Sequence, residues 1–329
     1  MTATLCWSRW TQEDCAVVWV VVPALDEAEN LKVLVPRIRA ALAEVAVDGQ
    51  VLVVDDGSTD GTSDVVRAMA DLYGDVHLET LRRNLGKAAA LQRGFSRALE
   101  GGADVIVMMD ADGQDDPAEL GRLLEPIRLG HSDLVTGART VRRDRFVKRH
   151  TSKLYNATTR WIAATPGRDF NSGYKAMRAE VAQDVVPMMY GEMHRYLTVL
   201  AHHSGYRVSE QTVEHHPRMS GDSKYGLARF WRGMSDLVTV RFLLSYEHRP
   251  SHLFGGLGVV LFLLGSVVLG YLTVIKLLGE PIGGRPLLIA GVLAVLMGLQ
   301  FVIFGLLAEL VVNARNRSAG QVRSSTHVG

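Results

Sequence analysis

Short apolar runs that end in acidic residues recur along the first half of the chain. Continuous runs rich in Val, Leu and Ile cover 16–22, 51–54 and 105–109, and polar residues follow each run. Strands that are buried on both faces of a parallel sheet have this unbroken apolar pattern, and helical stretches alternate with them because parallel strands need crossover connections. The pattern therefore predicts an α/β domain with a mainly parallel sheet and helices on both faces.

Two long uncharged apolar stretches, 253–275 and 286–308, dominate the last third of the chain. Each has about 23 residues and as a helix reaches about 35 Å, enough to cross a hydrocarbon core of about 30 Å. Helices buried in a soluble protein are the alternative, but they rarely stay uncharged over this length. The connection 276–285 is short and rich in glycine. The two stretches therefore predict a C-terminal hairpin of two transmembrane helices.

Basic residues lie mostly outside this predicted hairpin. The connection has two of them, Lys276 and Arg285. The flanks contain five arginines: Arg241, Arg249, Arg315, Arg317 and Arg323. Because positively charged flanks stay on the cytoplasmic side, the sequence predicts a multi-pass protein of the cell (inner) membrane with its N-terminal domain in the cytoplasm.

Glycines recur every seven residues in both apolar stretches. They are Gly258 and Gly265 in the first, and Gly291, Gly298 and Gly305 in the second. Small residues at regular spacing let two membrane helices approach closely, although glycine is common in membrane helices generally. A glycine seam between the two helices is a further expectation.

The segment 226–250, just before the hairpin, is basic and amphipathic. Such a helix suits the headgroup boundary of a bilayer, and packing against the N-terminal domain is the alternative. The expected organisation is an N-terminal domain over 1–225, an interfacial helix over 226–250, two transmembrane helices over 251–315 and a disordered polar tail over 316–329.

The charge, the cysteine content and the first residues of the chain bear on its partners and its compartment. The 329 residues have a formal net charge of +1, so no overall field favours a nucleic acid partner. The two cysteines, Cys6 and Cys15, form no disulfide framework, and a reducing compartment is the simpler expectation. The first residues lack the apolar core of a cleaved signal peptide.

The sequence VIVMMDADGQDDP contains the strongest chemical signal. Asp110 and Asp112 follow a predicted buried strand, and Gln114 comes next. Carboxylate oxygens are preferred ligands of Mg²⁺ and Mn²⁺, and a metal held there can bind a diphosphate and screen the charge on a departing phosphate. We expect Asp112 and Gln114 to hold the metal and Asp110 to support the metal shell or a ribose or sugar hydroxyl. A solvated acidic turn is the alternative.

Other polar groups follow strands at the same predicted edge. Glu27 comes after the first strand, and Asp55 and Asp56 come after the second. Ligands collect at the carboxyl ends of parallel strands, where carboxylates can accept hydrogen bonds from a base or a ribose. A dinucleotide fold and a P-loop are not supported, because neither glycine-rich sequence is present. Arg139, after a further strand, can bind a phosphate through its forked guanidinium.

Five motifs in a fixed order resemble glycosyltransferase family 2, the nucleotide-diphospho-sugar transferases with a GT-A fold. They are VVPALDEAENL, VVDDGSTDGT, NLGKAAALQRGF, MMDADGQDDP and VTGAR. The closer resemblance is to polyprenyl-phosphate and dolichol-phosphate glycosyltransferases, and DFNSGYKAMR, GEMHR and HHPRMSGDSKYG extend it to about residue 245. The resemblance implies a GDP- or UDP-sugar donor, a polyprenyl phosphate acceptor, a divalent metal (Mg²⁺ or Mn²⁺) and inversion at the sugar.

The resemblance also implies residue roles. By resemblance, the nucleoside-binding positions are Pro23, Leu25, Glu27, Val54 and Asp56. The family often has an aromatic residue where Leu25 stands, which leaves stacking on the base open. The expected donor site is completed by Asp55, Lys87, Asp110, Ala111, Asp112, Gln114 and Arg139, of which Asp110, Asp112 and Arg139 are expected to be catalytic. A solvated side chain is the alternative for Lys87.

The chemistry of the acceptor decides the class of transferase. A phosphate acceptor is already an anion and needs cationic anchors, whereas a hydroxyl acceptor needs a carboxylate base. By resemblance, Lys148 and Ser152 fall at acceptor-phosphate positions, and Arg218 and Lys224 fall at phosphate-contacting positions. For the region of Lys148 and Ser152, the alternative is ordinary basic charge beside the membrane, attracted to anionic lipid.

These features together predict a metal-dependent inverting glycosyltransferase that moves a hexose, with mannose or glucose favoured, from a nucleotide sugar to a polyprenyl (undecaprenyl or dolichyl) phosphate. Transfer to a lipid hydroxyl such as diacylglycerol is one alternative, with Glu192 as the only nearby base. A non-catalytic membrane scaffold that binds a nucleotide sugar is another. The motifs do not encode the donor base, the sugar, a homo-oligomeric state, or the roles of His194 and Arg195.

Overall fold

The computed structural model describes residues 16–45, 47–139, 172–189, 191, 193–214, 250–283 and 286–325. The chain divides into two compact units, Met1–Val240 and Arg241–Gly329. The predicted interfacial helix, 226–250, lies outside the described residues apart from Pro250.

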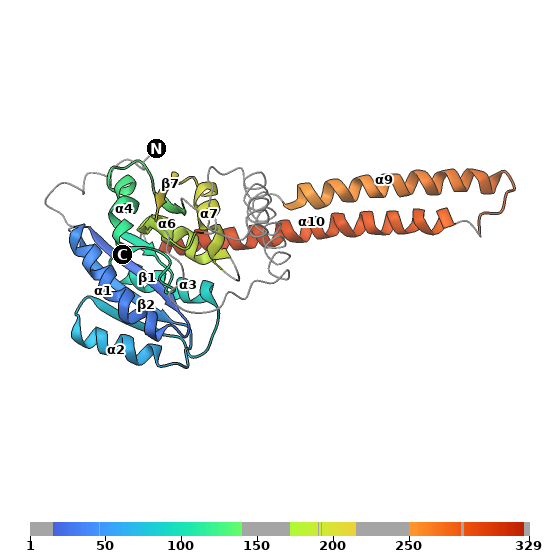
Figure 1. Ribbon diagram of the computed structural model, residues 1–329. Helices are drawn as coiled ribbons and strands as arrows, with labels where there is room; N and C mark the ends of the chain where they lie inside the picture. The colour runs from blue at the N-terminus through green and yellow to red at the C-terminus, as the bar shows by residue number, and fades with distance from the viewer. Residues whose placement is uncertain are drawn as a thin grey trace. The chain divides into compact units, whose positions relative to one another are not determined.

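One sheet of seven strands forms the centre of the N-terminal unit (Figure 1), in the order β3-β2-β1-β4-β6-β5-β7. Its strands are β1 (Val17–Ala24), β2 (Asp48–Asp55), β3 (Val76–Thr80), β4 (Val105–Met108), β5 (Leu134–Arg139), β6 (Lys175–Arg178) and β7 (Val208–Val213). Strand β6 runs antiparallel to both of its neighbours, and the other pairs are parallel. The predicted mainly parallel sheet is confirmed.

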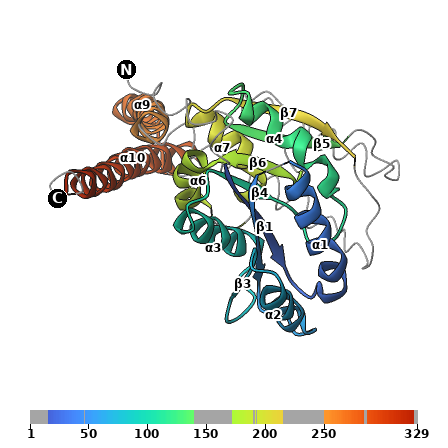
Figure 2. The ribbon, with the colours of Figure 1, turned by 90° about the vertical axis from the view of Figure 1, so that its left-hand side faces the viewer.

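Helices cover both faces of the sheet (Figure 2). One face packs against α1 (Ala28–Glu44), α2 (Thr62–Leu72) and α4 (Leu120–Arg128). The other face packs against α3 (Lys87–Glu100), α6 (Ala179–Val185) and α7 (Leu197–His203). Within the described residues, short 3₁₀ turns lie in the connections: η2 (Pro117–Glu119), η3 (Val186–Met188) and η4 (Met193–Tyr196). This is the predicted GT-A-like α/β architecture.

The central strand β1 is buried on both sides. Val18, Val20 and Val22 pack in one hydrophobic core with the buried face of α1, and each has no exposed surface. On the opposite face α3 approaches so closely that a methyl group on Gly94 would overlap Val21. Only glycine permits this approach, so Gly94 allows α3 to lie directly against β1.

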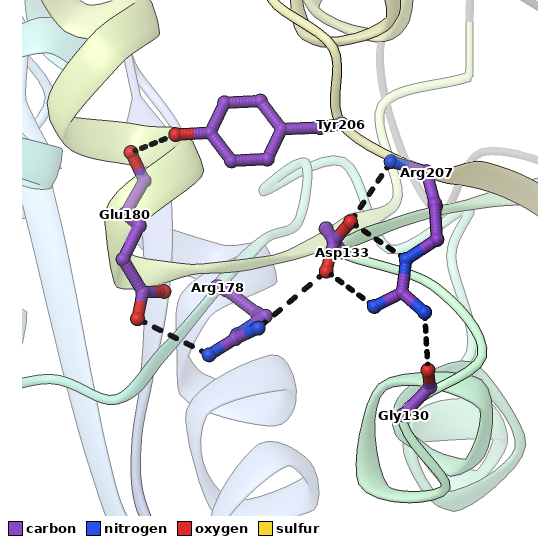
Figure 3. A network of polar contacts seen from close by, with 6 residues as sticks. All are labelled: Gly130, Asp133, Arg178, Glu180, Tyr206 and Arg207. Carbon is purple, nitrogen blue, oxygen red and sulfur yellow. Dashed lines mark hydrogen bonds and ion pairs between the residues drawn. The ribbon is translucent and has the colours of Figure 1, made fainter. Parts of the chain in front are cut away.

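A network of ion pairs holds three strands together at the end of the sheet where β5 and β7 begin (Figure 3). Asp133, just before β5, accepts three hydrogen bonds from Arg207, just before β7, at 2.8–3.1 Å. Arg178, the last residue of β6, lies 3.5 Å from the same carboxylate. Arg207 also donates to the carbonyl oxygen of Gly130 at 2.7 Å. These contacts hold β6, β5 and β7 together where β5 and β7 begin.

In the C-terminal unit the structure describes two helices, α9 (Pro250–Leu277) and α10 (Pro286–Ser325). The stretches Phe254–Leu277 and Pro286–Val311 are long and apolar enough to cross a membrane. Only 17% and 11% of the residues in their most apolar windows are buried. The core helix of a soluble protein would be mostly buried, so this exposure favours the predicted membrane spans.

The predicted glycine seam joins α9 and α10. A methyl group on Gly258 would lie 2.7 Å from the carbonyl oxygen of Gly298, and one on Gly265 would lie 2.8 Å from the carbonyl oxygen of Gly291. Larger side chains at these positions would push the helices apart. Close contact is therefore confirmed for Gly258, Gly265, Gly291 and Gly298, and the part of Gly305 in the repeat stays a prediction.

The end of α10 differs from the expectation. The helix continues to Ser325, so residues 316–325 are helical where their polarity predicts a disordered tail. These residues include no proline, and extending an existing helix is easier than nucleating a new one.

Candidate active site

The strand order reverses between β1 and β4, because β2 and β3 lie on one side of β1 and the remaining strands lie on the other. Ligands of open α/β sheets bind at the carboxyl ends of the strands at such a point. Pro23 and Ala24 at the end of β1 pair with Val54 and Asp55 at the end of β2. Strand β4 pairs with the opposite side of β1. The residues that follow these three strands therefore define the candidate site.

The loop after β1 is held in a strained conformation by the loop after β2. Asp26 has a φ of +55°, a left-handed value that is uncommon outside glycine. Its Oδ1 accepts a hydrogen bond from the Thr59 N–H at 2.8 Å, and its own N–H donates to Ser58 Oγ at 2.9 Å. The neighbouring Leu25 side chain is 40% exposed. Leu25 is therefore accessible to a ligand on a loop whose backbone is fixed.

Glu27 continues this connection between the two loops. Its N–H donates to Thr62 Oγ1 at 3.0 Å, and its carboxylate accepts a hydrogen bond from Asn30 at 2.5 Å. The N–H of Ala28 donates to Asp60 at 3.0 Å. The two loops predicted to bind the nucleoside thus form one hydrogen-bonded unit.

Both carboxylates at the end of β2, those of Asp55 and Asp56, are buried and already accept hydrogen bonds. Asp55 accepts one from the N–H three residues later, at 2.8 Å, and one from the Ser63 hydroxyl. Asp56 accepts from the N–H groups of Leu85 at 2.7 Å and Gly86 at 2.8 Å. Asp56 therefore fixes the loop that starts α3. Each carboxylate oxygen can accept a further bond, and the nucleoside contacts of this pair stay predictions.

An ion pair joins Lys87 to Asp110 at the reversal point. Lys87 is the first residue of α3, and its Nζ lies 2.5 Å from Asp110 Oδ1. About a third of each side chain, 33% and 30%, stays exposed. Gly173 lies against the same carboxylate, because a methyl group placed on it would lie 2.5 Å from Asp110 Oδ2. The position of the Asp110 carboxylate is therefore restricted by both residues.

Asp112 and Gln114 lie in the turn after Asp110. Asp112 Oδ1 accepts a hydrogen bond from the Gln114 N–H at 3.1 Å, and Ala111 between the two aspartates is buried. In the part of the chain that the structure describes, no group of three or more His, Cys, Asp or Glu side chains forms a closed metal site. Two carboxylates and an amide nevertheless suit Mg²⁺, which usually takes its remaining ligands from substrate phosphates and water.

The motif DFNSGYKAMR contains a buried lysine to which the sequence assigned no role. Lys175 of β6 has no exposed surface and donates to the carbonyl oxygen of Ser172. It pairs across the sheet with Met108, two residues before Asp110. A lysine is seldom fully buried unless it is paired, and Lys175 lies beside the strand that leads to Asp110.

His194 is a second residue whose place only the structure defines. It lies in η4, which packs against α3, and its side chain is buried. Burial first, and then the positive charges of Lys87 and Arg195, lower the pKa of His194 to about 3, so the imidazole is neutral near pH 7. Among the described residues Nδ1 has no hydrogen-bond partner. It is therefore a buried polar atom without a partner in the described part of the chain, and the charges of Lys87 and Asp110 act on its ring.

Several predicted residues are not brought into the described site. The acceptor residues Lys148, Ser152, Arg218 and Lys224 and the candidate base Glu192 lie outside the described residues. Arg139 is the last residue of β5. The roles of these residues stay predictions.

Comparisons with known proteins agree with the motif resemblance. The model of the family "Glycosyl transferase family 2" matches residues 19–226. A dodecaprenyl-phosphate galacturonate synthase of Rhizobium johnstonii is 34% identical over 303 residues, which are 91% of this chain and 88% of that protein. An undecaprenyl-phosphate 4-deoxy-4-formamido-L-arabinose transferase of Serratia proteamaculans is 29% identical over 297 residues, which are 89% and 88% of the two chains.

One solved structure is similar to part of the chain. The crystal structure of glucosyl-3-phosphoglycerate synthase of M. tuberculosis superposes with a TM-score of 0.47 and 19% identity, over 69% of this chain and 80% of that one.

Proposed function

The chain belongs to glycosyl transferase family 2, and we propose that it transfers a sugar from a nucleotide-sugar donor to a polyprenyl phosphate at the cytoplasmic face of a membrane. The observation that carries the proposal is the site at the reversal point, where the Lys87–Asp110 pair and Asp112 lie at one edge of the sheet. A nucleoside diphosphate leaving group needs such a combination of carboxylates for a divalent cation and a fixed positive charge.

In this proposal Asp110, Asp112 and Gln114 hold Mg²⁺ or Mn²⁺. When bound, the cation neutralises charge that develops on the departing diphosphate. Lys87 and Arg139 add positive charge at the same phosphates. The acceptor oxygen forms its bond to the anomeric carbon on the face opposite the leaving group, while the bond from that carbon to the diphosphate breaks. This single displacement inverts the sugar configuration and needs no covalent enzyme intermediate.

The acceptor is supported by two independent features. The two curated relatives described above are both named for transfer to a polyprenyl phosphate. The chain also has two helices long and apolar enough to cross a membrane, which would keep the enzyme beside a lipid substrate. A phosphate acceptor is anionic before it reacts, so the reaction needs cations rather than a base.

The sugar is the most open part of the proposal. The sequence prediction is a hexose, mannose or glucose, whereas the relatives are named for a galacturonate and for a formamido-arabinose. We therefore propose only the reaction class, with the donor to be identified by assay.

The test is a transfer assay with the full-length protein in detergent. GDP-mannose, UDP-glucose and UDP-galacturonate are each supplied with a short polyprenyl phosphate and Mg²⁺ or Mn²⁺, and the lipid product is detected by mass spectrometry. We expect one donor to give a glycosylated polyprenyl phosphate and Asp112→Ala to give almost none. Donor hydrolysis without lipid product, across a wide panel of donors, would contradict the proposal.

A second experiment separates the phosphate acceptor from a lipid hydroxyl. Each charge-assisted contact to a phosphate contributes about 1.5–3 kcal/mol, so Arg218→Ala or Lys224→Ala should lower kcat/KM about 10- to 100-fold through a higher acceptor KM. Glu192→Gln should have a much smaller effect. If Glu192→Gln is nearly inactive while Arg218→Ala is normal, a lipid alcohol is the better acceptor.

A non-catalytic scaffold is disfavoured because it would not need the Asp110, Asp112 and Gln114 set.

A further inference from the structure

We infer that Lys87 is a placeholder cation: it neutralises Asp110 while the site is empty of donor, and it moves to the donor diphosphate when Asp110 and Asp112 take a divalent cation. The inference rests on the proposed transfer reaction and goes beyond it. It assigns to Lys87 the coupling of metal binding to diphosphate binding.

The first step of the argument is that an ammonium group and a metal compete for Asp110. Lys87 Nζ lies 2.5 Å from Oδ1, within the distance of a strong charge-assisted hydrogen bond. Gly173 packs against the same carboxylate, since a methyl group there would lie 2.5–2.7 Å from both oxygens and Cγ, and this contact limits where the carboxylate can move. A divalent cation ligated by this carboxylate would repel the ammonium, so Lys87 must leave Asp110 when the metal site fills.

The second step is that Lys87 can leave without disturbing the fold. Its backbone is fixed, because Asp56 binds the N–H groups of Leu85 and Gly86 just before it, and Gly86, the N-cap residue of α3, has a φ of +93°. The side chain is a third exposed and ends a flexible four-carbon stem. Rotation of this side chain alone can therefore move the ammonium by several ångströms.

The third step is that a diphosphate gives the displaced ammonium a better partner. A diphosphate carries more negative charge than a single carboxylate, and ammonium groups bind phosphate readily. Lys87 stands at the first position of α3, a helix of 14 residues with no acidic residue in its first turn, so the helix dipole also favours an anion there. Lys87 thus exchanges one anionic partner for a stronger one.

A linkage follows from these three steps. The metal alone must displace Lys87 and therefore binds weakly, whereas the metal and a diphosphate together satisfy both Asp110 and Lys87. Each ligand then raises the affinity for the other by the same factor. Removing the ammonium should break this coupling in a specific way: the metal alone binds more tightly, and the diphosphate adds less.

The experiment measures Mn²⁺ binding by the full-length protein in detergent, using the electron paramagnetic resonance signal of free Mn²⁺. Binding is measured with Mn²⁺ alone and with Mn²⁺ plus inorganic pyrophosphate, each relative to the same mixture without protein, because pyrophosphate itself binds Mn²⁺. For Lys87→Met we expect Mn²⁺ alone to bind about 3- to 10-fold more tightly than in the wild type, as loss of a partly exposed ion-pair competitor allows. The gain in Mn²⁺ affinity caused by pyrophosphate should fall about 10-fold.

Two further variants make the result specific. Lys87→Gln, which also lacks the charge but keeps a polar end, should behave like Lys87→Met. Arg128→Met removes one positive charge from an exposed ion pair with Glu125 at the C-terminal end of α4. It should leave both Mn²⁺ affinities within about 2-fold of the wild type, since screening limits the effect of distant surface charges.

The outcomes separate this inference from the proposed function. If Mn²⁺ alone binds no more tightly to either Lys87 variant, or if pyrophosphate raises affinity equally in variants and wild type, the placeholder role is wrong even though sugar transfer stands. If the wild type binds no Mn²⁺ with pyrophosphate present, both the inference and the metal-dependent part of the proposed function are wrong.

Discussion

Replacing Gly173 by alanine should remove most of the transferase activity while the protein stays folded. The added methyl carbon would lie 2.5 Å from Oδ2, 2.6 Å from Cγ and 2.7 Å from Oδ1 of Asp110. Carbon and oxygen atoms that are not bonded rest at separations of about 3.5 Å. The Asp110 carboxylate would therefore have to shift by about 0.5–1 Å, or rotate away from its present position.

The magnitude follows from the sensitivity of catalysis to position. A misplacement of about 1 Å at a reacting site can reduce the rate by about 10²-fold. We therefore expect kcat/KM for sugar transfer to fall about 10²-fold, or about 2.7 kcal/mol in transition-state free energy. The substitution adds only one methyl group beside a partly exposed carboxylate, so the melting temperature should change by a few degrees at most.

The assay compares initial rates of polyprenyl-phosphate glycosylation for the wild type, Gly173→Ala and a matched control, Gly74→Ala. A methyl group on Gly74 meets no described atom within 4 Å, so this control should keep normal activity. If Gly173→Ala retains more than about a third of wild-type kcat/KM, the reaction does not depend on the position of Asp110, and its predicted role in metal or sugar binding is wrong.

Three other experiments test separate parts of the reasoning. Asp112→Ala should reduce turnover about 10²-fold, and a chelator should abolish wild-type activity until Mg²⁺ or Mn²⁺ is restored; full activity in excess chelator would refute the metal site. In a background without native cysteines, Gly283→Cys should react with a membrane-impermeant maleimide from outside intact cells and Ser318→Cys should not; the reverse pattern would exclude a cytoplasmic catalytic domain. Burial by itself raises the pKa of Asp133, but hydrogen bonds from Arg207 outweigh it and the net shift is downward. The resulting stabilisation is present above the unfolded-state aspartate pKa of about 3.9 and is lost as the pH falls through the lower folded-state pKa. Asp133→Asn should therefore lower the free energy of unfolding by about 2–3 kcal/mol at pH 7, with a difference in thermal melting that shrinks below about pH 4; a pH-independent difference would contradict this assignment.

The sequence by itself determined the architecture and the family. Unbroken valine-rich runs predicted β1, β2 and β4, and two uncharged stretches predicted α9 and the apolar part of α10. The glycine repeat predicted their close contact. These features depend on periodicity and on residues close in sequence, which a single sequence displays directly. The polar end of α10 was the exception, because helix propagation from a preceding segment is not a property of the local composition.

Only the tertiary structure decided which of the predicted site residues contact one another. The ion pair of Lys87 with Asp110 joins two motifs through the packing of α3 on β1, which depends on Gly94. The burial of His194, and hence its neutral imidazole, likewise depends on distant segments. Burial and the distance between charges are set when separated parts of the chain pack together, and both control hydrogen bonding and pKa. The motifs therefore predicted which side chains belong to the site. The packing of α3 and of the segment before β6 around Asp110 determined which of them are in contact.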